Sequence, residues 1–92
     1  MPQIFRIGQY IVYFWSNEGR PLEPLHVHIA NGKPGANATK VWITEAGKCL
    51  LCNNNSHIPF QELRNLMRII EANCDIVIEK WLSTFGSLNY YC

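Results

Sequence analysis

The segment FQELRNLMRIIEANCDIVIEKWLSTF, residues 60–85, repeats apolar side chains at intervals of three or four positions over its whole length. Successive residues of an α-helix are rotated by about 100°, so this spacing collects the apolar side chains on one stripe. The segment therefore predicts a helix that packs by this stripe against the rest of the chain. At ~1.5 Å per residue the helix would be about 39 Å long, which favours a kink near Asn73. The stripe consists of Phe60, Leu63, Met67, Ile70, Cys74, Val77, Ile78, Trp81, Leu82 and Phe85.

A second, smaller apolar stripe lies on the opposite side of the same predicted helix and contains Ile69 and Ile76. A helix that packs on a sheet buries only one of its sides, so the sheet of this chain leaves the second stripe uncovered. Neighbouring exposed apolar side chains mark interaction surfaces in small proteins. We therefore assign Ile69 and Ile76 to a predicted binding surface.

The chain before the helix is rich in β-branched and aromatic residues, which favour strands, and is interrupted by turn residues. Residues 5–15 predict one strand with large side chains on both faces, and the sequence SNEG at residues 16–19 predicts a turn after it. Residues 25–30 and 39–44 predict two further strands, and residues 49–52 predict a short fourth strand. Strands followed by a helix are typical of the α+β class.

We therefore predict an α+β fold with a three- or four-stranded, mainly antiparallel sheet and one long C-terminal helix packed on one face. Residues 1–92 are expected to form a single domain. The sheet is expected to span residues 3–55 and the helix residues 60–85, where Gly86 is suited to end it. A short aromatic tail, residues 86–92, follows the helix.

The sequence LHVHI places His26 and His28 two positions apart within an apolar strand. Alternate residues of a strand face opposite ways, and a shift by one residue would put imidazoles into the core. We therefore expect both histidines to lie side by side and to face away from the helix. The residues expected to face the helix from this strand are Leu25, Val27 and Ile29.

Three interpretations of His26 and His28 remain open. The pair is placed to act as a general acid and a general base, with Lys40 or Arg6 stabilising negative charge. Two imidazoles on one strand face also suit zinc, provided that a neighbouring strand supplies the other ligands. The third interpretation is a polar strand face without a chemical role. His26 and His28 are the candidate catalytic residues, and we predict neither a bound metal nor a cofactor.

The strand face that carries the histidines is expected to carry Trp42 and Lys40, and also Tyr10 and Phe14 from the first strand. Left in water, these aromatic side chains would form a larger apolar patch than monomers usually tolerate. We therefore predict that Tyr10, Phe14, Lys40 and Trp42 form a binding surface. The chain is expected to form a homo-oligomer or to bind a small protein partner.

Cys49 and Cys52 form a single Cys-x-x-C sequence. Structural zinc sites usually combine two such pairs, or one pair with two histidines. Positions three apart in a strand face opposite ways, so the two thiols are not expected to converge. We interpret them as ordinary buried or half-buried cysteines.

The composition limits the classes of partner. Apolar residues make up 48% of the chain, charged residues 16%, and the formal net charge is +1. Nucleic-acid binding requires clustered Lys and Arg, so it is disfavoured here. No apolar stretch is long enough to cross a bilayer, and the first residues lack the pattern of a secretory signal. We therefore expect a cytoplasmic protein that makes no membrane contact.

Four stretches, in this order, resemble a bacterial family of small proteins that is catalogued as domain of unknown function 4160. They are MPQIFRIGQYIVYFW, EPLHVHI, TKVWIT and EKWLSTFG. The chain departs from the family pattern at Leu25, where a second proline is common, and in carrying Cys49 and Cys52. The family has no established chemistry. The resemblance implies that a second small protein is encoded nearby, in pairs that in some cases look like toxin–antitoxin modules.

Three functions follow from these observations. The favoured one is an interaction protein, half of a two-gene, toxin–antitoxin-like module that binds a small partner through exposed apolar surface. The second is a small hydrolase or RNA-cleaving toxin that uses His26 and His28, although an RNA-cleaving enzyme would want a more basic surface. The third is a zinc-binding module.

Overall fold

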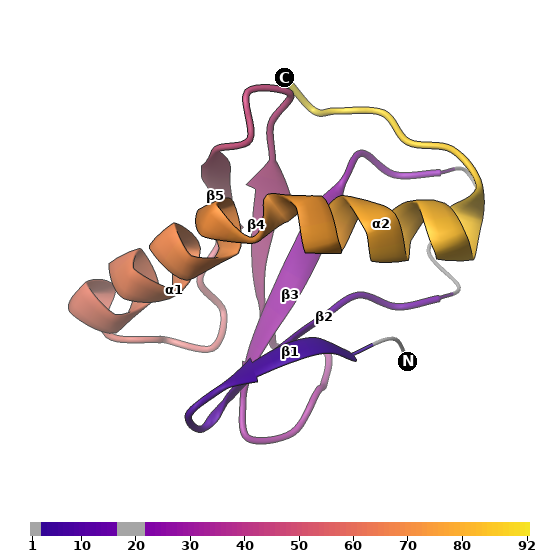
Figure 1. The fold of residues 1–92 in the computed structure, drawn as a ribbon. Coiled ribbons are helices and arrows are strands. Elements are labelled where there is room, and N and C mark those ends of the chain that lie inside the picture. Colours follow the sequence, from indigo (N-terminus) through magenta and orange to yellow (C-terminus); the bar gives the residue numbers. More distant parts are fainter. Residues whose placement is uncertain (1–2, 17–21) are drawn as a thin grey trace.

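Five strands form one antiparallel sheet, and two helices lie across one of its faces (Figure 1). The computed structural model describes residues 3–16 and 22–92, so most of the predicted turn at residues 16–19 lies outside the described residues. The α+β class is confirmed. The elements are β1 (Gln3–Ile7), β2 (Tyr10–Tyr13), β3 (His26–Asn31), β4 (Thr39–Ile43), β5 (Cys49–Asn53), α1 (Phe60–Ala72) and α2 (Cys74–Phe85).

The prediction of three or four strands is wrong because residues 5–15 do not form one strand. The chain reverses at Gly8 and Gln9, and Ile7 pairs with Tyr10 across the turn between β1 and β2. Gly8 has a φ angle of +59°, which a residue without a Cβ adopts at little cost. Glycine at the first of two turn residues is favoured in tight hairpins. The apolar residues on both sides of this glycine gave the appearance of one continuous strand.

The prediction of one long helix is wrong because residues 60–85 form two helices, but the kink that was expected near Asn73 is confirmed as the position of the break. Asn73 separates α1 from α2, with a φ angle of −120° and a ψ angle of 24°. Its side-chain amide donates to the Ile69 carbonyl at 2.8 Å, and its own carbonyl accepts from the Ile76 N–H at 3.0 Å. Asn73 therefore ends one helix and begins the next. Gly86, with a φ angle of +78°, ends α2 as expected.

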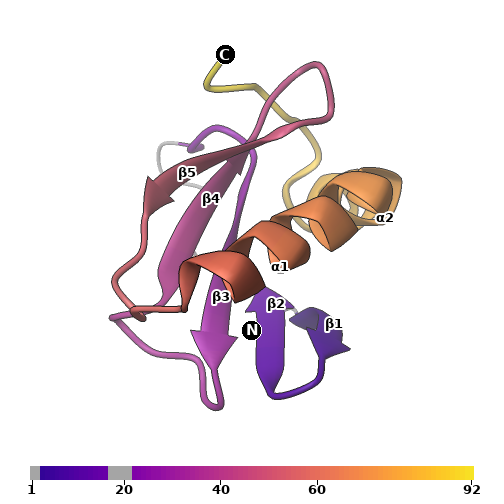
Figure 2. The ribbon, with the colours of Figure 1, turned by 90° about the vertical axis from the view of Figure 1, so that its left-hand side faces the viewer.

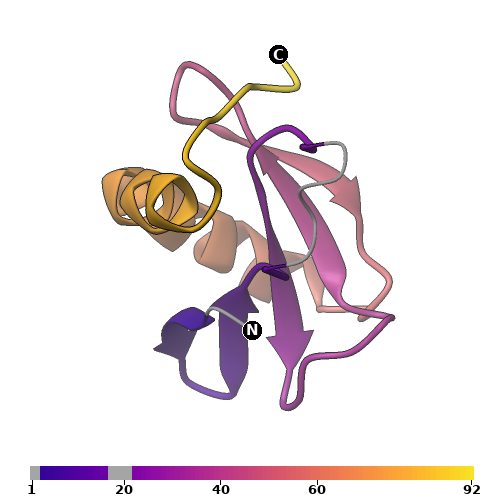
Figure 3. The ribbon, with the colours of Figure 1, turned by 90° about the vertical axis from the view of Figure 1, so that its right-hand side faces the viewer.

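The main core lies between the sheet and the two helices, which Figures 2 and 3 show on the same side of the sheet. The predicted contact between alternate strand residues and the helical stripe is confirmed, because both sets belong to one buried cluster. Two members of the stripe are exposed, however: Phe60, the first residue of α1, is 71% exposed and Leu82, in the last turn of α2, is 41% exposed. The strand residues in this cluster include Leu25, Val27, Ile29, Val41 and Ile43, and the helix residues include Leu63, Ile70, Val77 and Trp81.

Trp81 is the largest side chain of this core and is completely buried. Its ring centroid lies 5.0 Å from that of Phe14 and 4.5 Å from that of Phe85. Its Nε1 atom is buried and has no hydrogen-bond partner within residues 3–16 and 22–92. Trp81 therefore stabilises the fold through packing alone, at the cost of one unsatisfied donor.

The predicted surface position of Tyr10 and Phe14 is wrong, because their exposed fractions are only 7% and 0%. The register of β2 explains this difference. Tyr13 pairs with His28 in β3, so the odd-numbered residues of β2 share a face with the histidines and the even-numbered residues face the helices. A smaller cluster on the opposite sheet face contains Ile11, Tyr13, Ala30 and Ala38, with Trp15 packed against it.

Neither α1 nor α2 is long and apolar enough to span a bilayer, a finding that applies to residues 3–16 and 22–92.

We expect Trp81→Ala to lower the free energy of unfolding by about 3–5 kcal/mol, because it leaves a cavity in a fully packed core. Trp81→Phe should cost less, since it keeps most of the ring and removes the unpaired donor. Urea denaturation followed by circular dichroism measures both values. Leu82→Ala on the exposed side of the same helix is the matched control, and a loss as large as that of Trp81→Ala would contradict the prediction.

Candidate functional site

A continuous row of six ring side chains crosses the sheet face opposite the helices, which we call the open face. Neighbouring ring centroids along this row are 4.8 to 5.7 Å apart. The rings come from β3, β4, the end of β2 with the residues after it, and the tail that follows α2. This set, called the ring row below, consists of Trp15, Tyr13, His28, His26, Trp42 and Tyr91.

The two candidate catalytic histidines lie side by side, as expected, with ring centroids 5.0 Å apart. Their surroundings nevertheless differ. His28 is partly exposed on the open face, where its ring contacts that of Tyr13. His26 is completely buried, and its ring lies 5.3 Å from the ring of Trp81. The expectation that both histidines face away from the helices is therefore wrong for His26, the first residue of β3, whose ring also reaches α2.

The buried ring of His26 is held in one orientation. Its Nδ1 atom lies 2.9 Å from the carbonyl oxygen of Pro24. A carbonyl oxygen only accepts hydrogen bonds, so this contact places a proton on Nδ1. Trp42 and His28 pack against the same ring at nearly right angles. A general acid or base must reach the atom that it protonates, and this enclosure keeps His26 from a substrate on the open face.

The charge of Lys40 is compensated beside the ring row. Its Nζ atom lies 2.8 Å from Glu23 Oε1 and 4.4 Å from the centroid of the Trp42 ring. The ammonium group therefore takes part in an ion pair and a cation–π contact. Arg6, the other proposed cation, lies on β1, where its Nε atom donates to the carbonyl of Gly8. The structure does not bring Lys40 and Arg6 together on one site.

Two members of the predicted binding surface, Tyr10 and Ile69, line a separate groove between the β1–β2 turn and α1, with a volume of about 290 Å³. Tyr10 reaches this groove with its hydroxyl group, which donates to Glu62 Oε2. Ile69 lines the groove and is 39% exposed, while Ile76 on α2 is 41% exposed. The groove is lined by Ile7, Gly8, Gln9, Tyr10, Glu62, Asn65, Leu66 and Ile69.

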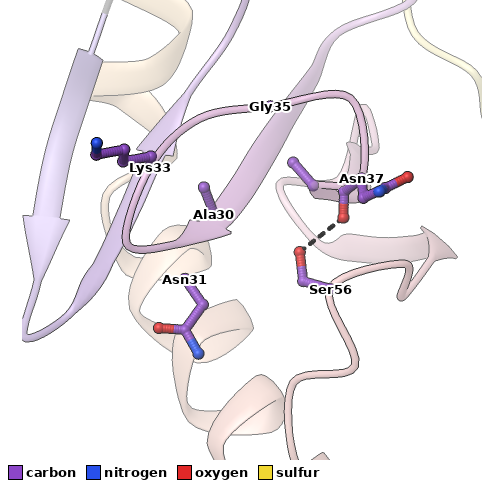
Figure 4. A pocket seen from close by; sticks show the side chains of 7 residues that line it. Ala30, Asn31, Lys33, Gly35, Asn37 and Ser56 are labelled. Atoms are coloured by element: carbon purple, nitrogen blue, oxygen red, sulfur yellow. Dashed lines mark hydrogen bonds between the residues drawn. The ribbon is translucent and has the colours of Figure 1, made fainter.

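A polar recess of about 340 Å³ lies beside the loop between β3 and β4 (Figure 4). The hydroxyl of Ser56 donates to the Asn37 carbonyl at 3.0 Å, and its oxygen accepts from the Thr39 N–H. Figure 4 shows Lys33 and Asn37 on opposite sides of the recess. These hydrogen bonds tie the loop before α1 to the sheet, so we interpret the recess as part of the fold.

The two cysteines of the Cys-x-x-C sequence lie in different surroundings. Cys49 is half-buried, and burial raises the pKa of its thiol to about 12, with further contributions from Glu71 and Cys74. Cys52 is exposed, and both thiols are free. Within the described part of the chain, no three His, Cys, Asp or Glu side chains are arranged to hold a metal ion.

The geometry defines a small α+β protein whose sheet is covered by helices on one face and carries the ring row on the other. The chain belongs to the family described as Domain of unknown function (DUF4160), whose model matches residues 10–82. No curated protein and no solved structure matches the chain. The family match includes five members of the ring row and ends before Tyr91.

Sequence reasoning found three members of the ring row and missed the other three. Tyr13 and Trp15 alternate with Tyr10 and Phe14 along the chain, so placing Tyr10 and Phe14 on the face of the histidines excluded them, and the register of β2 was the missing information. Tyr91 follows the last helix, and nothing in its local sequence indicates that it returns to the sheet. Glu62 was missed because its partner, Tyr10, was expected on the other face.

The hydrogen bond to Glu62, followed by burial, raises the pKa of Tyr10 above its ordinary value of 10.0. A group whose pKa is higher in the folded than in the unfolded protein stabilises the folded state at pH values below its unfolded pKa. This stabilisation is lost as the pH rises through its folded pKa. Stability should therefore fall above about pH 10. In Tyr10→Phe this fall should be less steep, as measured by urea denaturation between pH 8 and 11. Tyr91→Phe is the control, and equal slopes in wild type and Tyr10→Phe would argue against the prediction.

Cys49 should react with iodoacetamide much more slowly than Cys52 in the folded protein at pH 8. The thiolate is the reactive species, and burial suppresses both its formation and its access to the reagent. Mass spectrometry of digested samples taken over time measures modification at each site. In urea the two rates should converge, whereas equal rates in the folded protein would refute the assigned environments.

Proposed function

We propose that this chain is a protein-interaction module that binds a small partner protein through the ring row. The observation that carries this proposal is the continuous series of ring contacts across the open face. Aromatic side chains bury large areas with little loss of conformational freedom, and they dominate the energetic centres of protein interfaces. The buried rings of Tyr13 and His26 support the accessible rings of the row, which therefore supply a preorganised surface for a partner. The accessible rings are those of Trp15, His28, Trp42 and Tyr91.

The charges near the row support a protein partner over a nucleic acid. Lys40 is paired with Glu23, and the net charge of the chain is only +1. Nucleic-acid binding relies on several uncompensated cations that neutralise phosphates. Protein interfaces instead combine a ring-rich centre with a charged rim, which is the arrangement of Trp42 beside the Lys40–Glu23 pair.

The enzymatic alternative has weaker support. A hydrolase or RNA-cleaving toxin of the expected kind would use His26 and His28 as acid and base. His26 is enclosed, and the carbonyl of Pro24 occupies its Nδ1 atom. His28 would then have to act without the second imidazole. The same burial favours a structural contribution of His26 to the row.

The first candidate for the partner is a small protein encoded next to this one, as expected for a two-gene, toxin–antitoxin-like module. We place the interaction in the cytoplasm. The four free thiols support a reducing compartment. Self-association through the same rings is the competing outcome, which light scattering at high protein concentration distinguishes.

Calorimetric titration with the neighbouring gene product tests the proposal. Trp42→Ala should weaken binding by about thirtyfold, the loss typical of a strong interface residue. Ile69→Ala, at the groove between the β1–β2 turn and α1, should leave the affinity within about twofold and serves as the matched control. Circular dichroism of each variant verifies the fold. Equal affinity of wild type and Trp42→Ala would refute the ring row as the binding surface, and a loss confined to Ile69→Ala would move the interface to the groove.

A further inference from the structure

The tail that follows α2, residues 86–92, places one of its own side chains on the ring row. The ring of Tyr91 stacks on that of Trp42, with centroids 4.8 Å apart and planes within 4° of each other. The other ring contacts of the row are tilted or edge-on. The parallel stack therefore covers one face of the Trp42 ring.

Two backbone hydrogen bonds hold the tail across the end of the sheet, next to the start of β3 and the β4–β5 turn. The Leu25 N–H donates to the Asn89 carbonyl at 2.9 Å, and the Glu45 N–H donates to the Cys92 carbonyl at 3.0 Å. Tyr91 lies between these two anchoring points. The sheet thus recognises a peptide segment by two carbonyl oxygens, three residues apart, and an aromatic side chain between them.

The cover over Trp42 is only partial. The ring of Tyr91 remains 59% exposed, and the tail has no regular secondary structure. Residues 86–92 also follow the part of the chain that matches the family model, which ends at residue 82. The surface on β3 and β4 therefore belongs to the family region, whereas the segment that covers it lies beyond that region.

We propose that the tail is a displaceable cover, and that Trp42 with the Leu25 and Glu45 amides forms a binding site for an extended peptide segment that carries an aromatic side chain. This inference rests on the proposed function, because it names the chemistry of the partner at the same surface. The partner segment replaces Tyr91 on Trp42 and takes over the two backbone hydrogen bonds. The tail competes from within the same molecule and lowers the affinity of the site.

The expected size of this competition follows from the contact that is lost. A stacked aromatic pair contributes a factor of roughly two to ten to a binding equilibrium beyond its area. Removal of the Tyr91 ring leaves the site on Trp42 open, so an external aromatic segment should bind more tightly by about the same factor. The hydrogen bonds of the tail backbone remain in such a variant and keep the effect modest.

The probe is a fluorescein-labelled peptide with the sequence of residues 86–92, in which Cys92 is replaced by serine. Its affinity for the full chain is measured by fluorescence polarisation in wild type, Tyr91→Ala, and the double variant Trp42→Ala with Tyr91→Ala. Tyr91→Ala should bind the peptide roughly two- to tenfold more tightly than wild type, and the double variant should lose this gain. A control peptide with both tyrosines replaced by alanine should not distinguish the three proteins.

Equal affinity of wild type and Tyr91→Ala would overturn the proposal, and so would a gain that persists in the double variant. A wild-type dimer that dissociates on Tyr91→Ala, detected by light scattering, would also overturn it, because the tail would then be exchanged between two copies. The peptide assay contains no partner protein. Its failure therefore leaves the calorimetric test of the neighbouring gene product intact, and failure of that test leaves the peptide result intact.

Discussion

The strict alternation of β3 is the constraint on which the rest of the structure depends. This strand is central in the order β1-β2-β3-β4-β5, so both of its faces must be occupied. The helices pack against Leu25, Val27 and Ile29, which leaves the alternate positions to His26 and His28. The pairing of His26 with Trp42 and of His28 with Tyr13 then extends the same division to both neighbouring strands. The alternation of apolar residues in this strand thus builds the core on one side of the sheet and leaves the positions between them for the ring row.

Rings suit the open face because it is neither a full core nor a fully solvated surface. Tyrosine, tryptophan and histidine combine an apolar body with a polar edge, so they pack against one another and still tolerate water. The loop after β3 closes one side through the Tyr13 hydroxyl and the Gly35 backbone. The tail closes the end of the sheet through Tyr91 on Trp42. Tyr13 and His26 are therefore completely buried within the row, whereas His28 and Trp42 are partly exposed and accessible to a partner.

The sequence predicted those features that periodicity alone determines. The helical stripe, the inward face of β3 and the irregularity at Asn73 each follow from residues close together in the chain. The side of the sheet on which Tyr10 and Phe14 lie does not, because it depends on the pairing of β2 with β3 across a loop. The hairpin at Gly8 was hidden by strand-forming residues on both sides, and the stack of Tyr91 on Trp42 joins residues 49 positions apart. Long-range pairings of this kind depend on tertiary contacts that no local pattern encodes.

His26 connects the core with the candidate site and therefore belongs to both. Its ring contacts Trp81 of α2 on one side and Trp42 of the ring row on another. Packed interiors deform little, so the position of α2 fixes the His26 ring, and the His26 ring supports Trp42. A substitution at His26 would disturb the core and the row together, and a loss of binding would have two explanations. Trp42 is partly exposed and lies outside the buried core cluster, so a substitution there separates the function of the open face from the stability of the fold better than one at His26.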